Sequence, residues 1–226
     1  MSSAFTPTER SQARRRPQRA AYDEASVYAI LDASLLAHVG YVIDGQPFVT
    51  PTSFWREGRT LYWHGSAHSR ALSRQEGTPV CVTVSHLDGL IVARSGIAHS
   101  AQYRSVMAFG TARPIEGREA KRAAMAAFID RLYPGRWATL RPVLDAELDA
   151  ISVIGMEIEE AAAKVKAEGV ARLPADEAWP GWRGVIPVRQ VLGAVEALDE
   201  GPLPDSISLY GADGALDAAL TAAVQA

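Results

Sequence analysis

The chain has 226 residues, 48% of them hydrophobic, which is enough to bury the core of one domain. Its formal net charge at pH 7 is -3. Nucleic acids and anionic membrane surfaces are bound by clustered Lys and Arg. A negative net charge therefore argues against a protein that binds them through an overall basic surface. The composition therefore indicates a small-molecule role with no nucleic-acid partner.

Cysteine usage and hydropathy exclude further classes. Cys81 is the only cysteine, so no disulfide can form within the chain. No apolar run reaches the roughly 18 residues of a membrane span, and the first residues lack the apolar segment of a secretory signal. We therefore expect a cytoplasmic protein with no membrane partner.

The termini differ in composition from the middle of the chain. Residues 1–20 form a predicted basic arm, which we interpret as mobile or draped over the surface. Alternatively, one or two of its arginines fold back onto an anionic ligand or a partner subunit. We expect one folded domain at residues 21–195 and a C-terminal extension at 196–226. The arginines of the arm are Arg10, Arg14, Arg15, Arg16 and Arg19.

The first half of the chain begins with a predicted helix and continues with strands. Apolar residues recur at helical spacing over 22–36. Three short β runs follow between residues 38 and 65, separated by turn signals at Asp44-Gly45 and Glu57-Gly58. A short polar-apolar segment over 69–75 precedes two predicted strands at 79–84 and 90–93. Successive hairpins predict an antiparallel meander.

The second half adds helices to this meander. We expect a strand at 103–112, helices at 118–133 and 140–149, and a strand at 151–159. Beyond residue 197 the chain is assigned as irregular, with a last helix at 215–224. Strands joined by hairpins rather than by crossover helices favour an antiparallel barrel. The predicted fold class is mainly β with inserted helices, an α+β arrangement.

Several common catalytic motifs are absent from the sequence. It contains no P-loop, no Rossmann glycine motif, no G-x-S-x-G elbow and no H-E-x-x-H. His64 and His68 lie four residues apart, but Gly65-Ser66-Ala67 between them predicts a turn rather than a helix. We therefore expect no metal site.

The most informative segment runs from residue 62 to residue 70. A strand end is followed by small hydroxyl residues, including Ser66 and Ser69, and then by Arg70 at the start of a short helix. Backbone N–H groups, a hydroxyl and a guanidinium are suitable donors for a phosphate monoester. The alternative is that Ser69 only caps the helix and Arg70 lies on the surface.

The order of these segments resembles that of FMN-binding split-barrel proteins related to pyridoxamine-5′-phosphate oxidase, in the branch with nitroimidazole-resistance proteins. The segments that carry the resemblance extend from about Arg14 to Val188 and include HVGYVIDGQPFVTPTSFWREGRTLYWHGSAHSRAL, PVCVTVSHLDGLIVARS, YRSVMAFGTARPI, LYPGRW and WRGVIPV. The resemblance implies an antiparallel six-stranded split β-barrel, FMN as the cofactor, and a homodimer that holds the flavin at the subunit interface.

The resemblance also implies roles for individual residues. It places Thr50, Pro51 and Thr52 along the flavin ring and ribityl chain, and Tyr62 and His64 on the next strand as further contacts. It assigns the phosphate-binding turn to Ser66, Ser69 and Arg70, a contact from the neighbouring subunit to Ser105, and closure of the pocket to Trp182. For Trp182, the alternative is a packing role in the core.

The sequence departs from the family pattern in two places. Ala98 precedes His99 where close relatives have a second histidine, and Ala163 replaces a serine before Lys164. His99 is a candidate acid or substrate anchor, although an isolated loop histidine is more often solvated. A C-terminal substrate-phosphate signature is not recognisable, so pyridoxamine-phosphate oxidase activity is not expected. We expect an FMN-dependent oxidoreductase; the alternatives are a flavin-storage dimer and a barrel that binds a deazaflavin or haem.

Overall fold

The computed structural model describes residues 3–198 and 200–226, and these residues contain nine strands in one sheet. Each pairing between neighbouring strands is antiparallel. The strands are β1 (Ala20–Ala21), β2 (Leu36–Ile43), β3 (Gln46–Glu57), β4 (Thr60–Ser66), β5 (Pro79–Val92), β6 (Ser100–Pro114), β7 (Ile151–Glu157), β8 (Glu160–Lys166) and β9 (Gly184–Pro187).

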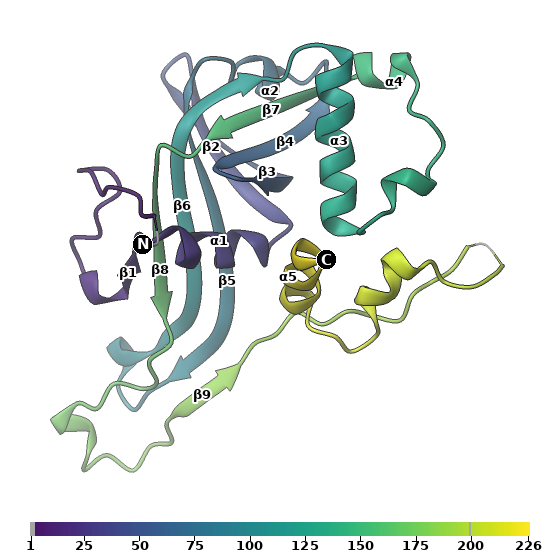
Figure 1. Cartoon of the computed structure of the whole chain (residues 1–226). Coiled ribbons are helices and arrows are strands. Elements are labelled where there is room, and N and C mark those ends of the chain that lie inside the picture. The colour runs from purple at the N-terminus through teal and green to yellow at the C-terminus, as the bar shows by residue number, and fades with distance from the viewer. Residues whose placement is uncertain (1–2, 199) are drawn as a thin grey trace.

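Strands β2 to β7 close into a ring of six, in the order β6-β7-β4-β3-β2-β5 and back to β6 (Figure 1). The ring closes because β5 pairs with β2 on one side and with β6 on the other. The predicted mainly antiparallel fold built on six strands is confirmed. Strands β1, β8 and β9 extend the sheet outside the ring.

The ring consists of two halves that share two long strands. Strand β3 pairs with β2 as far as Ser53 and with β4 from Phe54 onward. Strand β6 pairs with β5 as far as Thr111 and with β7 from Ala112 onward. Each long strand therefore changes partner partway along its length, and β3 and β4 separate on one side of this change.

Helices cover the ring from outside and close one end. The α-helices are α1 (Glu24–Asp32), α2 (Arg70–Ser73), α3 (Arg118–Leu132), α4 (Asp145–Asp149) and α5 (Leu216–Gln225). The 3-10 turns are η1 (Pro17–Arg19), η2 (Gly96–Ala98), η3 (Trp137–Thr139), η4 (Pro174–Asp176) and η5 (Asp205–Tyr210). Figure 1 shows α3 alongside β3, β4 and β7, with α5 below the end of α3. None of these helices is long and apolar enough to cross a membrane.

The main core fills the interior of the ring. Side chains alternate along β2, so that Ala37, Val39 and Tyr41 are buried while their neighbours face outward. Helix α1 adds Val27 and Leu31, both fully buried, to the same core. The helical spacing of apolar residues over 22–36 therefore reflects packing of α1 onto the ring. The helix is shorter than predicted, since it ends at Asp32 and β2 begins at Leu36.

A second hydrophobic cluster lies outside the ring, between α3 and the strands β3, β4 and β7. Trp55 is fully buried there, and its ring centroid lies 5.0 Å from that of Phe128 and 5.4 Å from that of Tyr62. Such aromatic contacts add to the area that is buried. Helix α3, confirmed at nearly its predicted length, is thus held by the aromatic side of β3 and β4.

A buried charged group connects α1, β3 and α3. Arg56 binds Asp32 through two hydrogen bonds of 2.5 and 3.0 Å, and Arg131 Nη2 donates to the Asp32 carbonyl at 3.2 Å. Burial lowers the pKa of Arg131, whose Nε and Nη1 are buried without a partner in the described residues. Two guanidinium groups share one carboxylate, so loss of Asp32 would leave both without compensation.

The structure corrects three expectations about secondary structure. The two strands expected at 79–84 and 90–93 are one strand, β5, with a register shift between Leu87 and Gly89. The helix expected over 140–149 is only α4, since Pro142 lies in its first part. The strand expected over 151–159 is β7, which ends at Glu157, and the alanine-rich β8 that follows it was not predicted.

The N-terminal arm lies against β8. Phe5 is 2% exposed and belongs to the main core, while Arg10 Nε and Ser11 Oγ each donate to Glu160 at 2.8 Å. Arg19 pairs with Glu168 at 3.0 Å. The arm is therefore draped over the surface and anchored at several points rather than detached.

We expect Gly110→Ala to destabilise the protein strongly. A Cβ at this position in β6 would lie 2.2 Å from the Glu157 carbonyl oxygen and 2.7 Å from Met156 Cγ. Strand β6 and the end of β7 would therefore have to move apart. Overpacking of this kind costs about 1–3 kcal/mol or more. Urea denaturation measures the loss. Gly96→Ala, which meets no atom within 4 Å, is the control and should change stability little; equal stabilities of the two variants would contradict the close approach.

Candidate functional site

A pocket of about 210 Å³ lies where β3 and β4 separate. The two strands pair only between Phe54–Trp63 and Glu57–Thr60, and α2 follows the free end of β4. Pro51 fits the unpaired edge of β3 because it has no N–H to donate. The pocket is lined by Val39, Thr50, Pro51, Thr52, Trp63, His64, Gly65, Ser69, Ala71, Leu72 and Gln75.

The turn after β4 places α2 against the pocket. Ser69 caps α2, since its Oγ accepts a hydrogen bond from the Leu72 N–H at 3.4 Å. Ser66 Oγ accepts one from the His68 N–H at 3.2 Å. A Cβ on Gly65 would lie 3.0 Å from Leu72 Cδ1, so the absence of a side chain there lets α2 approach β4.

The wall of the pocket contains two buried polar contacts. Trp63 Nε1 donates to Gln75 Oε1 at 3.0 Å, and both residues are nearly inaccessible to solvent. The Tyr41 hydroxyl and Thr50 Oγ1 are hydrogen-bonded at 2.9 Å. These four side chains of the wall and its surroundings therefore have hydrogen-bond partners within the protein.

His64 lies on the aromatic side of the pocket. Its ring centroid is 5.1 Å from that of Phe128 and 6.1 Å from that of Trp55, and its Nδ1 is buried without a partner in the described residues. Burial lowers the pKa of His64. The imidazole is therefore neutral at pH 7 and has a buried nitrogen available to a ligand.

The structure brings half of the predicted site residues together. Thr50, Pro51, Thr52, His64 and Ser69 all line the pocket. Ser69 also caps α2, and Arg70 is exposed. Both features were expected from the alternative interpretation of the turn, in which Ser69 is a helix cap and Arg70 a surface residue. Ser66 is exposed at the end of β4.

The remaining predicted residues lie elsewhere in this chain. Tyr62 stacks on Trp55 beneath α3, where burial raises its pKa. Ser105 lies on β6, where its Oγ approaches the Lys164 carbonyl at 3.5 Å, and Trp182 is 67% exposed just before β9. His99 is exposed beside the β5–β6 connection, and its Nδ1 is 3.0 Å from the Ser95 carbonyl.

Sequence reasoning did not find Val39, Leu72 or Gln75 as pocket residues. Val39 and Leu72 look like ordinary core positions in the sequence, and Gln75 looks like the polar end of a surface segment. The role of Gln75 in the pocket wall becomes visible only in its hydrogen bond to Trp63, which lies 12 residues earlier in the chain. No local sequence signal encodes such a contact.

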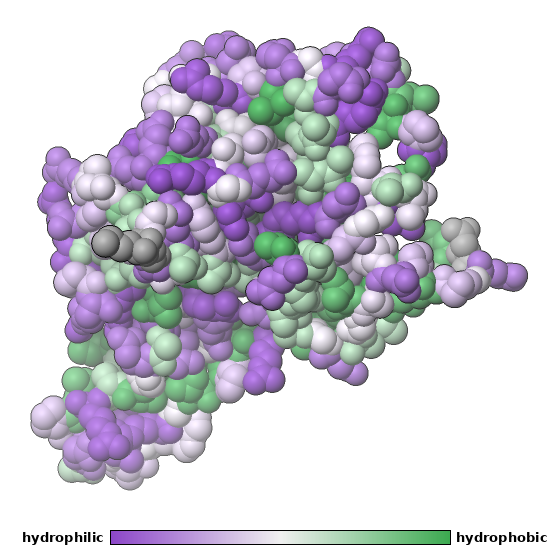
Figure 2. All heavy atoms as spheres, viewed as in Figure 1, coloured by the Kyte–Doolittle hydropathy of each residue, from purple (hydrophilic) through white to green (hydrophobic). Residues whose placement is uncertain are grey.

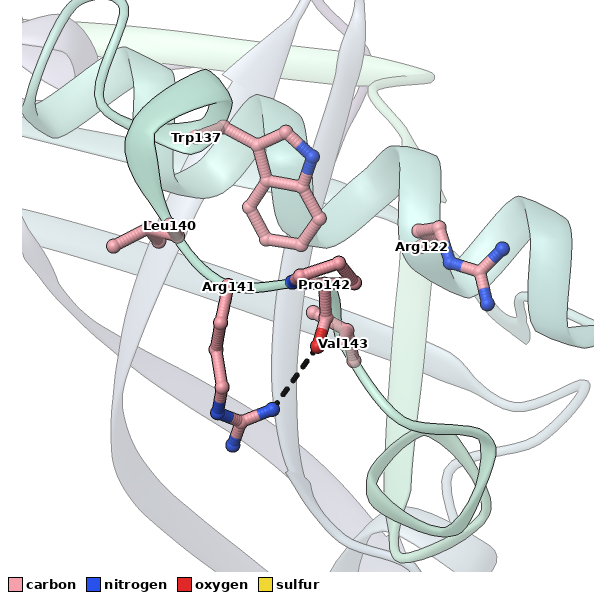
Figure 3. Close-up of a pocket in the computed structure, with 6 residues that line it drawn as sticks. All are labelled: Arg122, Trp137, Leu140, Arg141, Pro142 and Val143. Carbon is pink, nitrogen blue, oxygen red and sulfur yellow. Dashed lines mark hydrogen bonds between the residues drawn. The ribbon is translucent and has the colours of Figure 1, made fainter.

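A second, larger cavity of about 400 Å³ lies between α3 and the segment before α4 (Figure 3). Its side chains are those of Arg122, Trp137, Leu140, Arg141, Pro142 and Val143. Arg141 is paired with Glu147 at 2.9 Å, and this hydrogen-bonded pair lowers the pKa of Glu147 to about 2. Arg122 is paired with Glu119 at 2.7 Å. Both cationic groups are thus already compensated.

An exposed apolar face lies on the outside of β2, β3, β5 and β6. We call it the outer face and define it by Leu36, Val49, Leu87 and Met107, which are 41 to 67% exposed. Across its middle, His38 lies opposite Pro51 and Thr83, and Thr83 lies opposite Met107. Apolar surface of this extent on neighbouring strands indicates an interaction site.

A second exposed apolar region lies on the lower projection that carries β9. Figure 2 shows hydrophobic residues interspersed with hydrophilic ones there. Trp179 and Trp182 are each about two-thirds exposed, and Ile97 is almost fully exposed. Arg94 holds this region together by donating to the carbonyls of Gly181 at 2.6 Å and Asp176 at 3.0 Å.

The family assignment follows from comparison with known proteins. A family model described as pyridoxamine 5′-phosphate oxidase matches residues 23–165, which is more than half of the chain. The chain belongs to this family. The matched range contains the whole ring of six strands and the pocket between β3 and β4. No curated protein matches the chain.

Two solved structures resemble nearly the whole chain. The flavocytochrome Anf3 from Azotobacter vinelandii is 42% identical, with a TM-score of 0.84, over 91% of this chain and 98% of that one. An FAD and haem binding protein from Mycobacterium smegmatis is 34% identical, with a TM-score of 0.81, over 88% and 98%. A protein from Bacteroides thetaiotaomicron, provisionally assigned to 5-nitroimidazole resistance, shares the fold at 24% identity and a TM-score of 0.54, over 65% and 86%.

We expect the lowered pKa of His64 to make stability depend on pH. The unfolded state binds a proton below a pH of about 6.5 while the folded state does not, so stability falls as the pH drops through that value. His64→Phe should lose this component, which is about 1.4 kcal/mol for each unit by which the pKa is lowered. Urea denaturation at pH 7.5 and 5.5 measures it.

His68→Phe, at an exposed position on the same turn, is the control and should keep the wild-type difference between the two pH values. Equal differences for the wild type and His64→Phe would show that the burial of His64 does not affect its protonation.

Proposed function

We propose that this protein is a flavin-binding redox protein and that its flavin lies in the pocket between β3 and β4. The observation that carries the proposal is the position of this pocket, which brings Thr50, Pro51, Thr52, His64 and Ser69 to one site in a chain that is 42% identical to a flavocytochrome over 91% of its length. A bound flavin would supply hydride or single-electron transfer at its ring.

The chemistry of the pocket supports this assignment. The side chains of Val39, Leu72 and Ala71 offer an apolar wall, while the hydroxyls of Thr50 and Thr52 offer polar contacts at its edge. FMN and FAD share the ring, the ribityl chain and the first phosphate. The proposal concerns this shared part, with FMN as the cofactor implied by the family resemblance.

The size of the pocket supports a homodimer. Small-molecule sites usually enclose about 300–1,000 Å³, and this pocket is smaller. A second copy packed on the outer face would enlarge the enclosure and cover the exposed Val49 and Leu36. Ser105 and Trp182, which do not line the pocket of their own chain, would then act on the flavin of the partner subunit.

An enzymatic role is favoured over flavin storage. A storage protein would cover the ring with its own aromatic residues, and Trp55 and Trp182 are the candidates for such a cover. Trp55 is fully buried beneath α3, and Trp182 is exposed next to β9, where it is free to reach the flavin of the partner subunit. Neither side chain lines the pocket of its own chain, so no tryptophan of the same subunit covers the ring. We therefore propose an oxidoreductase.

Haem is the second cofactor that we propose. The solved structures at 42% and 34% identity are described as a flavocytochrome and as an FAD and haem binding protein. His99 would hold the haem iron, because its Nδ1 donates to the Ser95 carbonyl at 3.0 Å and leaves the lone pair of Nε2 available to a metal. The exposed apolar side chain of Ile97, on the same connection, suits a porphyrin edge.

The visible spectrum of the purified protein tests both cofactors. We expect the two absorption bands of an oxidised flavin together with a Soret band, and we expect His99→Ala to lose the Soret band while it keeps the flavin bands. His68→Ala, at an exposed position whose side chain does not line the pocket, is the matched control and should keep both. A protein that remains colourless after addition of FMN, FAD and haem would refute the proposal.

We expect a single charge on the outer face to disrupt the dimer. Val49 is 67% exposed, so Val49→Glu should leave the fold intact and prevent close packing of two apolar faces. Sedimentation velocity should show a dimer for the wild type and a monomer for this variant. Leu198→Glu, at a position that is 99% exposed, is the control and should remain dimeric. A monomeric flavin-loaded wild type would contradict the roles proposed for Ser105 and Trp182.

A further inference from the structure

Two uncompensated arginines lie side by side on α2. Arg70 is the first residue of the helix and Arg74 is its C-cap, whose N–H donates to the Arg70 carbonyl at 3.1 Å. Residues four apart share one helix face, so the two guanidinium groups are neighbours. Both are exposed, and neither side chain makes an ion pair or a hydrogen bond with the described residues.

Like charges at this spacing oppose each other, and most arginines of this protein avoid that situation. Arg104 is paired with Asp88 at 2.8 Å, Arg118 with Asp149 at 2.6 Å and Arg141 with Glu147 at 2.5 Å. Even neighbouring cations on α3 have carboxylates beside them, as Arg122 has with Glu119. Arg113 and Arg189 are also exposed without an ion pair in the described residues, but the pair on α2 lies beside the pocket, where an anionic ligand would relieve the repulsion.

The pair lies beside the pocket but not inside it. Helix α2 turns Ala71 and Leu72 toward the pocket, which leaves Arg70 and Arg74 on the outer side of the helix. Helical side chains lean toward the N-terminal end, so Arg70 reaches toward the turn at Ser66 and Arg74 reaches toward the position of Arg70. A ligand that leaves the pocket at this turn meets Arg70 first and Arg74 one helical turn later.

We propose that Arg70 and Arg74 bind the diphosphate of a flavin dinucleotide and that Arg74 makes the protein prefer FAD over FMN. The inference rests on the flavin-binding function proposed above. FMN ends at its single phosphate, which Arg70 contacts, whereas the second phosphate of FAD lies farther along and engages Arg74. Guanidinium groups suit this role because they are always charged and donate in pairs to phosphate oxygens.

Equilibrium binding of FAD and FMN, followed by flavin fluorescence on the apoprotein, tests the assignment. We expect the wild type to bind FAD at least 10-fold more tightly than FMN, which corresponds to one charge-assisted contact. Arg74→Ala should remove this preference by weakening FAD binding alone. Arg70→Ala should weaken the binding of both flavins by about 10-fold or more, and Arg74→Lys should restore part of the preference.

Arg189→Ala is the control, because it removes the same charge from an exposed residue that follows β9. Strand β9 and helix α2 lie at opposite ends of the molecule (Figure 1). This variant should bind both flavins as the wild type does. Equal affinities of the wild type for FAD and FMN, or equal effects of Arg74→Ala on both, would overturn this inference and leave flavin binding intact. Failure of the wild type to bind either flavin would overturn the proposed function as well.

Discussion

The constraint on which the site depends is the change of partner along β3. A strand has two edges, and β3 uses one for β2 as far as Ser53 and the other for β4 from Phe54 onward. The early residues of β3 and the last residues of β4 therefore have no common hydrogen-bond ladder. This separation opens the pocket, places Thr50 and Thr52 on one wall and His64 on the other, and leaves space for α2.

The surroundings of the pocket are rigid for identifiable reasons. Trp63 and Gln75 satisfy each other inside the wall, and Trp55 fixes the outer side of β3 and β4 against α3. Behind them, Asp32 holds Arg56 and Arg131 so that α1, β3 and α3 keep their relative positions. A buried charged group of this kind specifies an arrangement more than it adds stability, because desolvation offsets much of the attraction between the charges.

The arginines of the protein differ in whether they have carboxylate partners. Several arginines that stabilise the fold have carboxylate partners within the chain, as Arg104 and Arg118 do. Arg70 and Arg74 have none and lie beside the pocket. The apolar surfaces divide in the same way, since the core fills the ring while Val49, Met107 and Trp182 remain exposed. Exposed apolar side chains and uncompensated cations together mark the surfaces where a second copy and a cofactor are proposed to bind.

The sequence by itself determined the antiparallel fold class, the positions of α1, α3 and α5, the hairpin turns of β2 to β4, and the family. These features depend on local periodicity and turn chemistry, such as the positive φ angles at Asp44, Gly45 and Gly58 that the turn signals anticipated. The pairing of segments far apart in the chain was decided only by the tertiary structure. That pairing joined Gln75 to Trp63, turned Tyr62 under α3 instead of into the pocket, and made the alanines of β8 an outer strand, because strand register and burial depend on contacts that local sequence does not encode.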